Sequence, residues 1–502
     1  MTSSKRVLMP RDLATRFSPS TLVGHFLLAH GALHPPVGWH CFEYGAWTLL
    51  AQDSLPVLHI VDGTGAFMGW MLGHPISEST LLEETVQLQL ASQTPSALQV
   101  FEQYLEQLAG RFLAIVFASG TAHVYPDSTG SLAALYSPEH QMLSSSPFLV
   151  PYTPETQDRV ELLSALRVDA TRGQLLFGLG PRRGLWRLLP NHVLDISSWT
   201  SRRTWPKGEF TGGVNPADAV IAVGERVRRT LSALIQKGPL TMSLTAGYDS
   251  RMLLACARPF LDYIRFVTIP IPDWTARTDV RVASQICKRY KLSHLVPAWR
   301  EPTEDQKSLW LYRTGFTAGA PRGQSAVRCQ ASLGSEQPYT EGVCGEYCRR
   351  IKLARDKWFR GTPSPEELVG QFPGPIHKDL VRQATKWLAE LPIHDAITIT
   401  ELSWMENRVG SWAGPLTYGV PESYKFVLYP LGHRRNFELW LGLPPEYRAS
   451  GQFVTDLLLQ LWPDLLDIPF NPAPGWRGQI AQRTRRLAGR LRRAASHLIG
   501  QH

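Results

Sequence analysis

The sequence predicts two domains, an α+β domain rich in strands followed by an α/β domain built on a parallel sheet. A chain of 502 residues is long enough to form more than one hydrophobic core. Short apolar runs separated by turn residues dominate the chain up to residue 205. After a Gly- and Pro-rich stretch at 205–217, strand-like and helix-like segments alternate, which is typical of a parallel sheet. We therefore expect domains at 1–205 and 206–475, followed by a tail at 476–502.

The first domain is predicted from its strand and turn signals. Residues 57–61 (VLHIV) form an apolar run that ends at a turn signal. Residues 112–117 and 121–125 flank a Ser-Gly turn and should pair as a hairpin. A helix over 97–108 separates the early strands from the later ones, and this order indicates an α+β arrangement.

The second domain begins with a well-marked helix. Asn215 is a candidate N-cap, Pro216 occupies the first helical position, and the apolar stripe ends at Lys237-Gly238. Strands are then expected at 240–244, 264–269 and 294–297, with helices at 251–257 and 279–290 between them.

Composition excludes several classes of protein. With 43% hydrophobic and 19% charged residues, the chain resembles ordinary soluble globular proteins. No apolar run reaches the roughly 18 residues of a membrane helix, and the N-terminus lacks the apolar core of a signal peptide. Six scattered Cys indicate reduced thiols in a cytoplasmic protein, and Cys344 with Cys348 alone make too few ligands for a zinc site.

The net charge of +9 is concentrated at the C-terminus. Seven Arg lie between Arg477 and Arg493, so the rest of the chain carries 9 − 7 = +2 and gives no strong nucleic-acid signal. Apolar residues recur at helical spacing among these Arg up to Leu498, which predicts a basic amphipathic helix over 477–498. Such a helix suits a peripheral position on an anionic membrane, an acidic partner or a nucleic acid. It equally suits packing on its own domain with a solvated basic face.

The segment 245–250 (TAGYDS) carries the chemistry. It turns a predicted strand into a predicted helix, and the amides at a helix N-terminus bind phosphate. Gly247 allows close approach and positive φ, and Thr245 and Ser250 offer hydroxyl groups. Asp249 would repel phosphate unless a cation intervenes, so Mg²⁺ is expected there. The alternative is a turn capped by Asp249 or Ser250 without any ligand.

Residues 243–256 (SLTAGYDSRMLLAC) resemble the PP-loop of the asparagine synthetase family, whose usual form is S-G-G-x-D-S. Ala246 replaces the first Gly of that motif and Thr245 replaces its Ser. Asp279 and His294 are similar to the Asp that opens the family's next helix and the His that closes it.

A second signature of the family, S-G-E-G-x-D-E, resembles residues 341–346 (EGVCGE) with one residue deleted. Gly342 and Glu346 match it, and Val343 replaces a glutamate. The family's later lysine is not evident, and Gln452 or Arg448 stands near its expected place.

The resemblance implies an adenine nucleotide alpha hydrolase-like (PP-loop) domain that binds ATP and Mg²⁺. It implies that Gly247, Asp249 and Ser250 hold the pyrophosphate with Mg²⁺, beside the other residues of the turn, Thr245, Ala246 and Tyr248. Leu244 and Val267 would flank the adenine, and Gly342 would line the ribose. Arg251 either adds positive charge near a phosphate or is a surface residue of the helix.

The first domain resembles the glutaminase domain of the same family, an Ntn-hydrolase fold, over residues 110–136 and 144–146. Glutaminases of this class use a Cys directly after the initiator Met as the nucleophile. Here that position is Thr2 and the first Cys is Cys41, so we expect no glutaminase activity.

The resemblance therefore implies an ATP-dependent amide-forming ligase without glutaminase activity. A carboxylate would be adenylated with release of pyrophosphate, and ammonia or an amine would then displace AMP. Asp249 would act in catalysis, and Glu346 or Tyr347 would replace the missing base. The alternative is a degenerate homologue that binds a nucleotide or a partner without catalysis.

Overall fold

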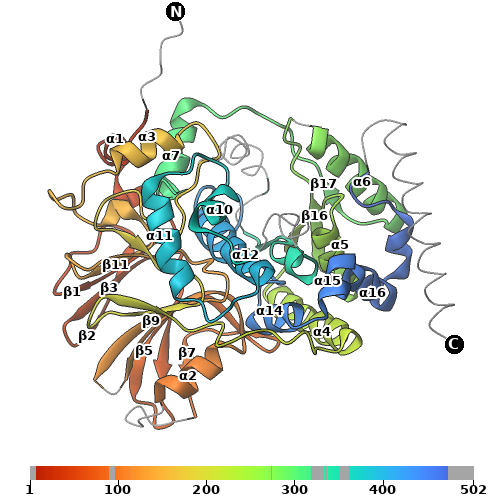
Figure 1. The fold of residues 1–502 in the computed structure, drawn as a ribbon, viewed down its shortest axis with the longest axis horizontal. Coiled ribbons are helices and arrows are strands. Elements are labelled where there is room, and N and C mark those ends of the chain that lie inside the picture. Colours follow the sequence, from red (N-terminus) through yellow and green to blue (C-terminus); the bar gives the residue numbers. More distant parts are fainter. Residues whose placement is uncertain are drawn as a thin grey trace, which may run out of the picture.

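The protein has a mixed α/β fold, with a β-rich N-terminal part and a later parallel sheet surrounded by helices (Figure 1). The computed structural model describes residues 7–89, 97–118, 120–272, 274–317, 333, 336–350 and 361–472. The predicted basic helix at 477–498 and Thr2 lie outside the described residues. No helix within the described ranges is both long enough and apolar enough to cross a bilayer.

Two sheets form the N-terminal part. The first has the order β12-β10-β11-β1-β3-β2 and is antiparallel throughout. Its strands are β1 (Phe26–His30), β2 (Trp39–Tyr44), β3 (Trp47–Gln52), β10 (Leu135–Ser137), β11 (Met142–Ser144) and β12 (Trp186–Arg187).

The second sheet has the order β14-β13-β9-β8-β5-β4-β7, with β6 paired to β5, and only β4 and β7 run parallel. Its strands are β4 (Val57–Val61), β5 (Phe67–Ser77), β6 (Thr80–Leu81), β7 (Thr85–Gln87), β8 (Leu108–Ala118), β9 (Thr121–Pro126), β13 (His192–Asp195) and β14 (Thr200–Arg203). The predicted strand at 57–61 and the predicted hairpin are thereby confirmed.

Apolar side chains from both sheets share one core, which holds them face to face. Phe26 and Leu49 of the first sheet lie in the same buried cluster as Trp70, Leu113 and Ile115 of the second. Alternate residues of the second sheet form another cluster with Phe101 of α2 (Ala97–Leu105), so this helix covers the outer face. The remaining N-terminal helices are α1 (Pro10–Ala14), η1 (Pro19–Thr21), η2 (Pro147–Leu149) and α3 (Val160–Leu166).

The C-terminal part contains a parallel sheet of order β17-β16-β15-β18-β19. Its strands are β15 (Leu240–Ser243), β16 (Ile264–Val267), β17 (His294–Leu295), β18 (Tyr339–Thr340) and β19 (Val427–Leu428). The first three were expected from the sequence. Strands β18 and β19 come from distant parts of the chain, and each has only two residues.

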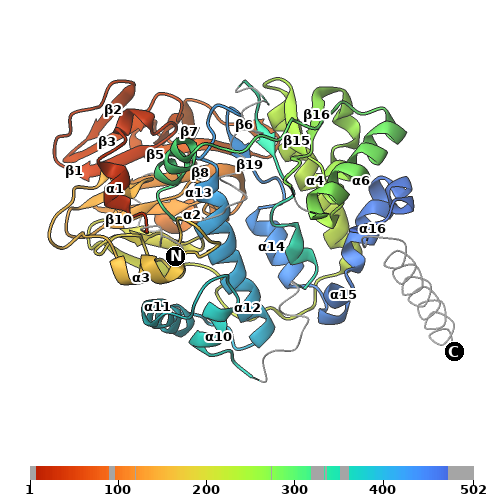
Figure 2. The ribbon, with the colours of Figure 1, turned by 90° about the horizontal axis from the view of Figure 1, so that it is seen from above.

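The described helices of the C-terminal part lie partly around this sheet and partly against the β-rich part (Figure 2). They are α4 (Pro216–Ile235), α5 (Tyr248–Cys256), η3 (Arg258–Tyr263), α6 (Trp274–Tyr290), α7 (Glu304–Arg313), η4 (Gly345–Cys348), α10 (Pro365–Gly370), α11 (Lys378–Ala389), α12 (Ala396–Trp404), η5 (Met405–Ala413), α13 (Gly414–Leu416), α14 (Arg434–Leu441), α15 (Pro445–Ser450), α16 (Gln452–Leu461) and η6 (Pro463–Asp467). Asn215 caps α4 as predicted, because its side chain accepts from the amides of Ala217 and Asp218. The helix predicted to begin at Asp279 instead begins by Trp274, so Asp279 lies inside it.

A helical column formed by α12, the π-helical segment η5 and α13 runs between the two parts of the molecule (Figure 2). Two glycines let it pack closely on the β-rich part. A Cβ on Gly410 would lie 2.6 Å from the ring of Pro190, and one on Gly414 would lie 2.7 Å from the carbonyl oxygen of Gly130.

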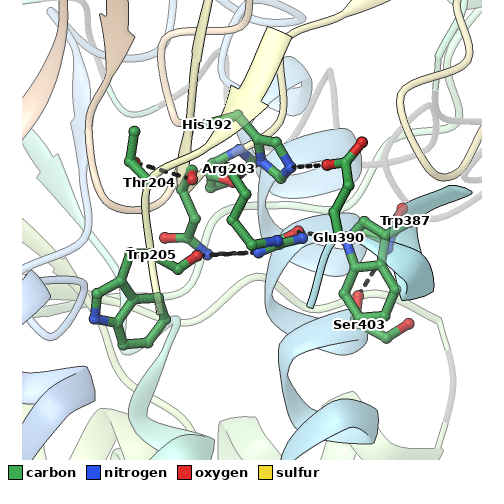
Figure 3. Close-up of polar contacts among 11 residues, drawn as sticks. His192, Arg203, Thr204, Trp205, Trp387, Glu390 and Ser403 are labelled. Carbon is green, nitrogen blue, oxygen red and sulfur yellow. Dashed lines mark hydrogen bonds and ion pairs between the residues drawn. The ribbon is translucent and has the colours of Figure 1, made fainter. Parts of the chain in front are cut away.

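A buried ion pair ties this column to the β-rich part. Glu406 of η5 accepts hydrogen bonds from Arg203 of β14 at 2.5 and 3.0 Å, from Asn191 at 2.7 Å and from the indole of Trp387 at 2.5 Å. Figure 3 shows Arg203 and Trp387 converging on this point, with His192 close by. The Glu406 side chain is fully buried and Arg203 is 4% exposed, so the pair lies in the core of the interface.

Candidate functional site

The 245–250 turn lies at the carboxyl end of β15, the middle strand of the parallel sheet, and leads into α5. Ligands of open parallel sheets bind at this edge. Gly247 precedes α5 with φ −77° and ψ 174°, so the positive φ allowed for in the prediction is not used. Its lack of a side chain matters for space, because a Cβ there would lie 3.2 Å from the hydroxyl oxygen of Thr245.

Side-chain oxygens already satisfy three amides of the turn. The amide of Thr245 donates to the Ser250 hydroxyl at 3.1 Å, and the amide of Gly247 donates to the Thr245 hydroxyl at 3.1 Å. The amide of Ala246 donates to the Asp279 carboxylate at 2.9 Å. The turn is therefore more closed than a simple anion-binding loop, and Asp279 acts by fixing its backbone.

Asp249 is paired with an arginine that the sequence did not single out. Arg349 donates from Nη1 to Oδ1 at 2.5 Å and from Nη2 to Oδ2 at 3.2 Å. Burial lowers the pKa of Arg349, but the Asp249 carboxylate more than offsets this effect and raises it above its ordinary value. The guanidinium therefore stays charged and holds both carboxylate oxygens.

This pairing does not fit the Mg²⁺ site expected at Asp249. Magnesium needs nearly octahedral oxygen ligands, and both oxygens of Asp249 are engaged by Arg349. Among the described residues, no three His, Cys, Asp or Glu side chains gather closely enough to hold a metal ion.

The segment 341–346 presses against the start of α5. A Cβ on Gly342 would lie 2.6 Å from the carbonyl carbon of Asp249, and one on Gly345 would lie 2.8 Å from the Cβ of Asp249. Only glycine allows this approach, which brings Glu346 and Asp249 to the same cavity.

Two half-buried carboxyl groups and one arginine line the same cavity beside the turn. Burial raises the pKa of Glu346, and the nearby Asp249 carboxylate raises it further. Burial also raises the pKa of Glu341. Arg408 lowers both, and its guanidinium lies 3.3 Å from the ring centre of Trp412. The site therefore combines proton-binding carboxyl groups with a cation held on an aromatic face.

Two adjoining cavities open at this edge of the sheet. The smaller measures about 270 Å³ and the larger about 590 Å³. The larger lies within the size range of small-molecule sites. Shared by both walls are Ser243, Thr245, Glu341, Val343, Arg408, Trp412 and Ala413. The smaller cavity also contacts Asp249, Ser250, Gly342 and Glu346.

Five of the predicted residues thus line the smaller cavity: Thr245, Asp249, Ser250, Gly342 and Glu346. Leu244 and Val267 do not line either cavity, because both side chains are buried in the core of the sheet. The neighbours Thr268 and Ile269 line the larger cavity instead of Val267. Thr268 and Ile269 follow the last residue of β16, so the cavity wall begins where the strand ends.

Ala246, Gly247 and Tyr248 also lie outside both cavity walls. The carbonyl of Ala246 accepts from the amide of Asn471 at 3.0 Å, and the ring of Tyr248 stacks on Phe470 with centroids 4.4 Å apart. This side of the turn therefore faces the end of the described chain.

The interpretation of Arg251 as a surface residue is wrong, and its side chain lines neither cavity, so its role near a phosphate stays a prediction. Its side chain is fully buried and donates to the carbonyl oxygens of Leu465, Ile468 and Pro469 at 3.4, 2.5 and 3.3 Å. The guanidinium also lies 4.0 Å from the ring centre of Phe470. Arg251 fastens the segment 465–470 to α5, and that segment covers the back of the turn.

We expect Arg251→Met to lower the free energy of unfolding by about 3 kcal/mol, because buried carbonyl groups lose a charged donor. Urea unfolding followed by circular dichroism measures the change. Arg289→Met is the matched control, since it removes an exposed ion pair with Asp467 of the same segment and should cost under about 1 kcal/mol. Equal losses in the two variants would contradict this role of Arg251.

Arg448 and Gln452, which stand near the expected place of the family's lysine, bind residues outside the two cavities. Arg448 is 4% exposed and donates to Glu401 at 2.6 Å and to the carbonyl of Tyr347 at 3.2 Å. Gln452 donates to Asp456 at 2.7 Å. Neither lines the two cavities.

Sequence reasoning missed the aromatic wall and its arginine. Trp404, Arg408 and Trp412 are spaced by four residues and lie on one face of the helical column, where all three line the larger cavity. The i, i+4, i+8 spacing was visible in the sequence. Arg349 carried no comparable signal, because its partner Asp249 lies 100 positions earlier.

The position that glutaminases of this class use, here Thr2, lies outside the described residues, so the expected lack of glutaminase activity stays a prediction. Cys41 lies exposed on β2, and slight desolvation together with the Glu43 carboxylate raises the pKa of its thiol, which makes it a weaker nucleophile. His25 is deeply buried and donates to or accepts from Ser145 at 2.8 Å, with a pKa of about 3 caused mainly by burial.

No protein-family model matches the chain, and no curated protein is similar enough to count as a match.

Proposed function

We propose that the chain is an ATP-dependent amide-forming ligase of the asparagine synthetase type that lacks glutaminase activity. The observation that supports this most directly is the pair of adjoining cavities at the carboxyl edge of the parallel sheet. Thr245 lies in the wall that they share, and Asp249 and Ser250 line the smaller one. One cavity suits the phosphate tail of a nucleotide, and the other has room for the nucleoside and an acyl substrate. The sequence resemblance supplies the class of reaction.

The architecture is compatible with the two fold families that the resemblance implies. An N-terminal pair of face-to-face sheets suits an Ntn-hydrolase-like domain, and the parallel sheet with a phosphate-binding turn suits a PP-loop domain. We propose both assignments, with the catalytic site in the second domain only.

In the proposed reaction, a substrate carboxylate oxygen attacks the α-phosphorus of ATP. The bond from that phosphorus to the bridging oxygen breaks, pyrophosphate leaves and an acyl-adenylate forms. Ammonia or an amine then attacks the acyl carbon, AMP leaves, and the nitrogen loses a proton to a base. The chain's own groups bind the phosphates, orient the carboxylate and accept the proton.

The larger cavity indicates an acyl substrate with an extended apolar or aromatic part. Trp310, Trp404 and Trp412 line it, together with Tyr339, Tyr424 and Tyr429. Arg172 and Arg408 in the same wall could each hold a carboxylate. Aromatic walls with few charged groups are typical of pockets for substrates larger than a simple amino acid.

ATP–pyrophosphate exchange tests the proposal. We expect the full-length chain to exchange labelled pyrophosphate into ATP only when a cognate carboxylate is present, because exchange requires reversible adenylation. A panel of aromatic and apolar carboxylates should be screened with and without Mg²⁺. ATP binding without exchange for any carboxylate would contradict ligase activity.

The second candidate is a degenerate homologue that binds a nucleotide or a partner without catalysis. The Asp249–Arg349 pair and the occupied amides of the turn favour it, as does Val343 in place of a family glutamate. In that case ATP would bind without exchange. The basic segment 477–498 would then be the natural place for an acidic partner or an anionic membrane.

A further inference from the structure

The charge balance of the smaller cavity differs from that of a metal-assisted phosphate site. Its wall contains three carboxyl groups, those of Asp249, Glu341 and Glu346. Three ionised carboxylates in the wall of one cavity would strongly repel a phosphate tail bound there. Either a cation must enter with the phosphate, or the chain must neutralise the carboxylates itself.

Arg349 neutralises Asp249 from behind the cavity wall. The two side chains make a bidentate pair, the strongest arrangement between a guanidinium and a carboxylate. Arg349 also donates to the carbonyl of Gly345 at 3.3 Å, and its guanidinium lies 5.1 Å from the ring centre of Tyr248. The Arg349 side chain is only 16% exposed, and together these contacts fix its position.

Arg408 reaches the cavity from η5. It lines both cavities, and the stack on Trp412 fixes its guanidinium there. Its side chain lies in the wall of the smaller cavity together with Asp249, Glu341 and Glu346, where a guanidinium can donate to a phosphate oxygen. The charge of Arg408 lowers the pKa of both Glu341 and Glu346, so this guanidinium offsets part of the negative charge that these two carboxyl groups bring to the cavity.

We infer that the smaller cavity binds the phosphate tail of ATP without a metal ion. Arg349 removes the repulsion of Asp249 that Mg²⁺ would otherwise have to offset, and Arg408 donates directly to the phosphate. The inference rests on the proposed function and adds to it that phosphate binding is independent of metal.

Calorimetric titration of the full-length chain with ATP, in EDTA and in Mg²⁺, tests this inference. We expect the wild-type Kd in EDTA to lie within about threefold of that in Mg²⁺. Arg349→Met should weaken binding at least about tenfold in EDTA, because Asp249 is left unpaired beside the phosphate. Added Mg²⁺ should restore much of the affinity by binding the exposed carboxylate.

The double variant Arg349→Met/Asp249→Asn separates charge from structure. We expect it to recover ATP binding in EDTA, since the uncompensated carboxylate is gone. Arg202→Met serves as the matched control, because it removes an exposed pair with Glu102 in the β-rich part and should leave both titrations unchanged.

Each outcome decides a different point. Wild-type binding that requires Mg²⁺ would overturn the inference while leaving the ligase proposal in place. No ATP binding in either buffer would overturn both. Should Arg349→Met fail to fold, Asp249→Asn alone decides, because the inference expects tighter binding in EDTA and weaker binding would refute it.

Discussion

Glu406→Ala should lower the free energy of unfolding by about 3–5 kcal/mol, because it leaves the Arg203 guanidinium buried and unpaired. Asn191 and Trp387 also lose an acceptor in the same place. Urea unfolding at neutral pH measures the loss. Since Glu406 joins the helical column to the β-rich part, the unfolding transition of this variant should also become broader or split in two.

Glu390→Ala is the control for this prediction. Glu390 lies 3.5 Å from His192 in the same region, but it is 46% exposed and its pair should contribute less than about 1 kcal/mol. Replacing both Glu406 and Arg203 by apolar residues of similar size should recover most of the lost stability, because no buried charge then remains. A Glu406→Ala variant as stable as Glu390→Ala would contradict this assignment.

The Glu406–Arg203 pair also makes the free energy of unfolding depend on pH. Burial raises the pKa of Glu406, but Arg203 and its other partners outweigh burial and lower it below its ordinary value of 4.5. A carboxyl group with a lowered folded-state pKa stabilises the protein above its unfolded-state pKa. The stabilisation by Glu406 should therefore be complete at neutral pH and be lost as the pH falls below about 4.5.

Local signals in the sequence predicted the first three strands of the parallel sheet and its flanking helices. Asn215 and Pro216 marked the start of α4 to the residue, because capping depends only on near neighbours. The strand at 240–244 and the turn after it were placed correctly for the same reason, since an apolar run followed by Thr-Ala-Gly is a local pattern.

Long-range pairing accounts for what the sequence did not predict. Strands β18 and β19 have two residues each and carry no periodic pattern, yet they complete one side of the sheet and bring Glu341 to the cavity. Arg349 is similar, because only the folded chain shows that it lies against Asp249. Arg251 was misjudged since its partners are backbone carbonyls, which no side-chain pattern reveals.

The group that accepts the proton in the second half of the proposed reaction can be chosen by geometry. Tyr347 was one candidate, but its hydroxyl group is buried outside both cavities and its pKa is raised well above 10 by burial. Glu346 lines the smaller cavity, and its raised pKa makes it a stronger base than an ordinary carboxylate. Glu341 has the same two properties and lines both cavities.

Glu346→Gln should therefore reduce amide formation by about 10²–10⁴-fold, the usual contribution of a positioned base. ATP–pyrophosphate exchange should persist in this variant, because adenylation of a carboxylate releases no proton from an amine. Glu341→Gln is the matched comparison, since it removes a second buried carboxyl group from the same wall. Because the pKa of Glu346 is raised, protonation of this group should make the amide-forming rate of the wild type fall already at a pH above 4.5. This acid-side fall should be absent from the pH profile of Glu346→Gln. If Glu346→Gln keeps its amide-forming rate and Glu341→Gln loses it, Glu341 is the base. If both variants keep their rates, neither carboxyl group of this wall is the base.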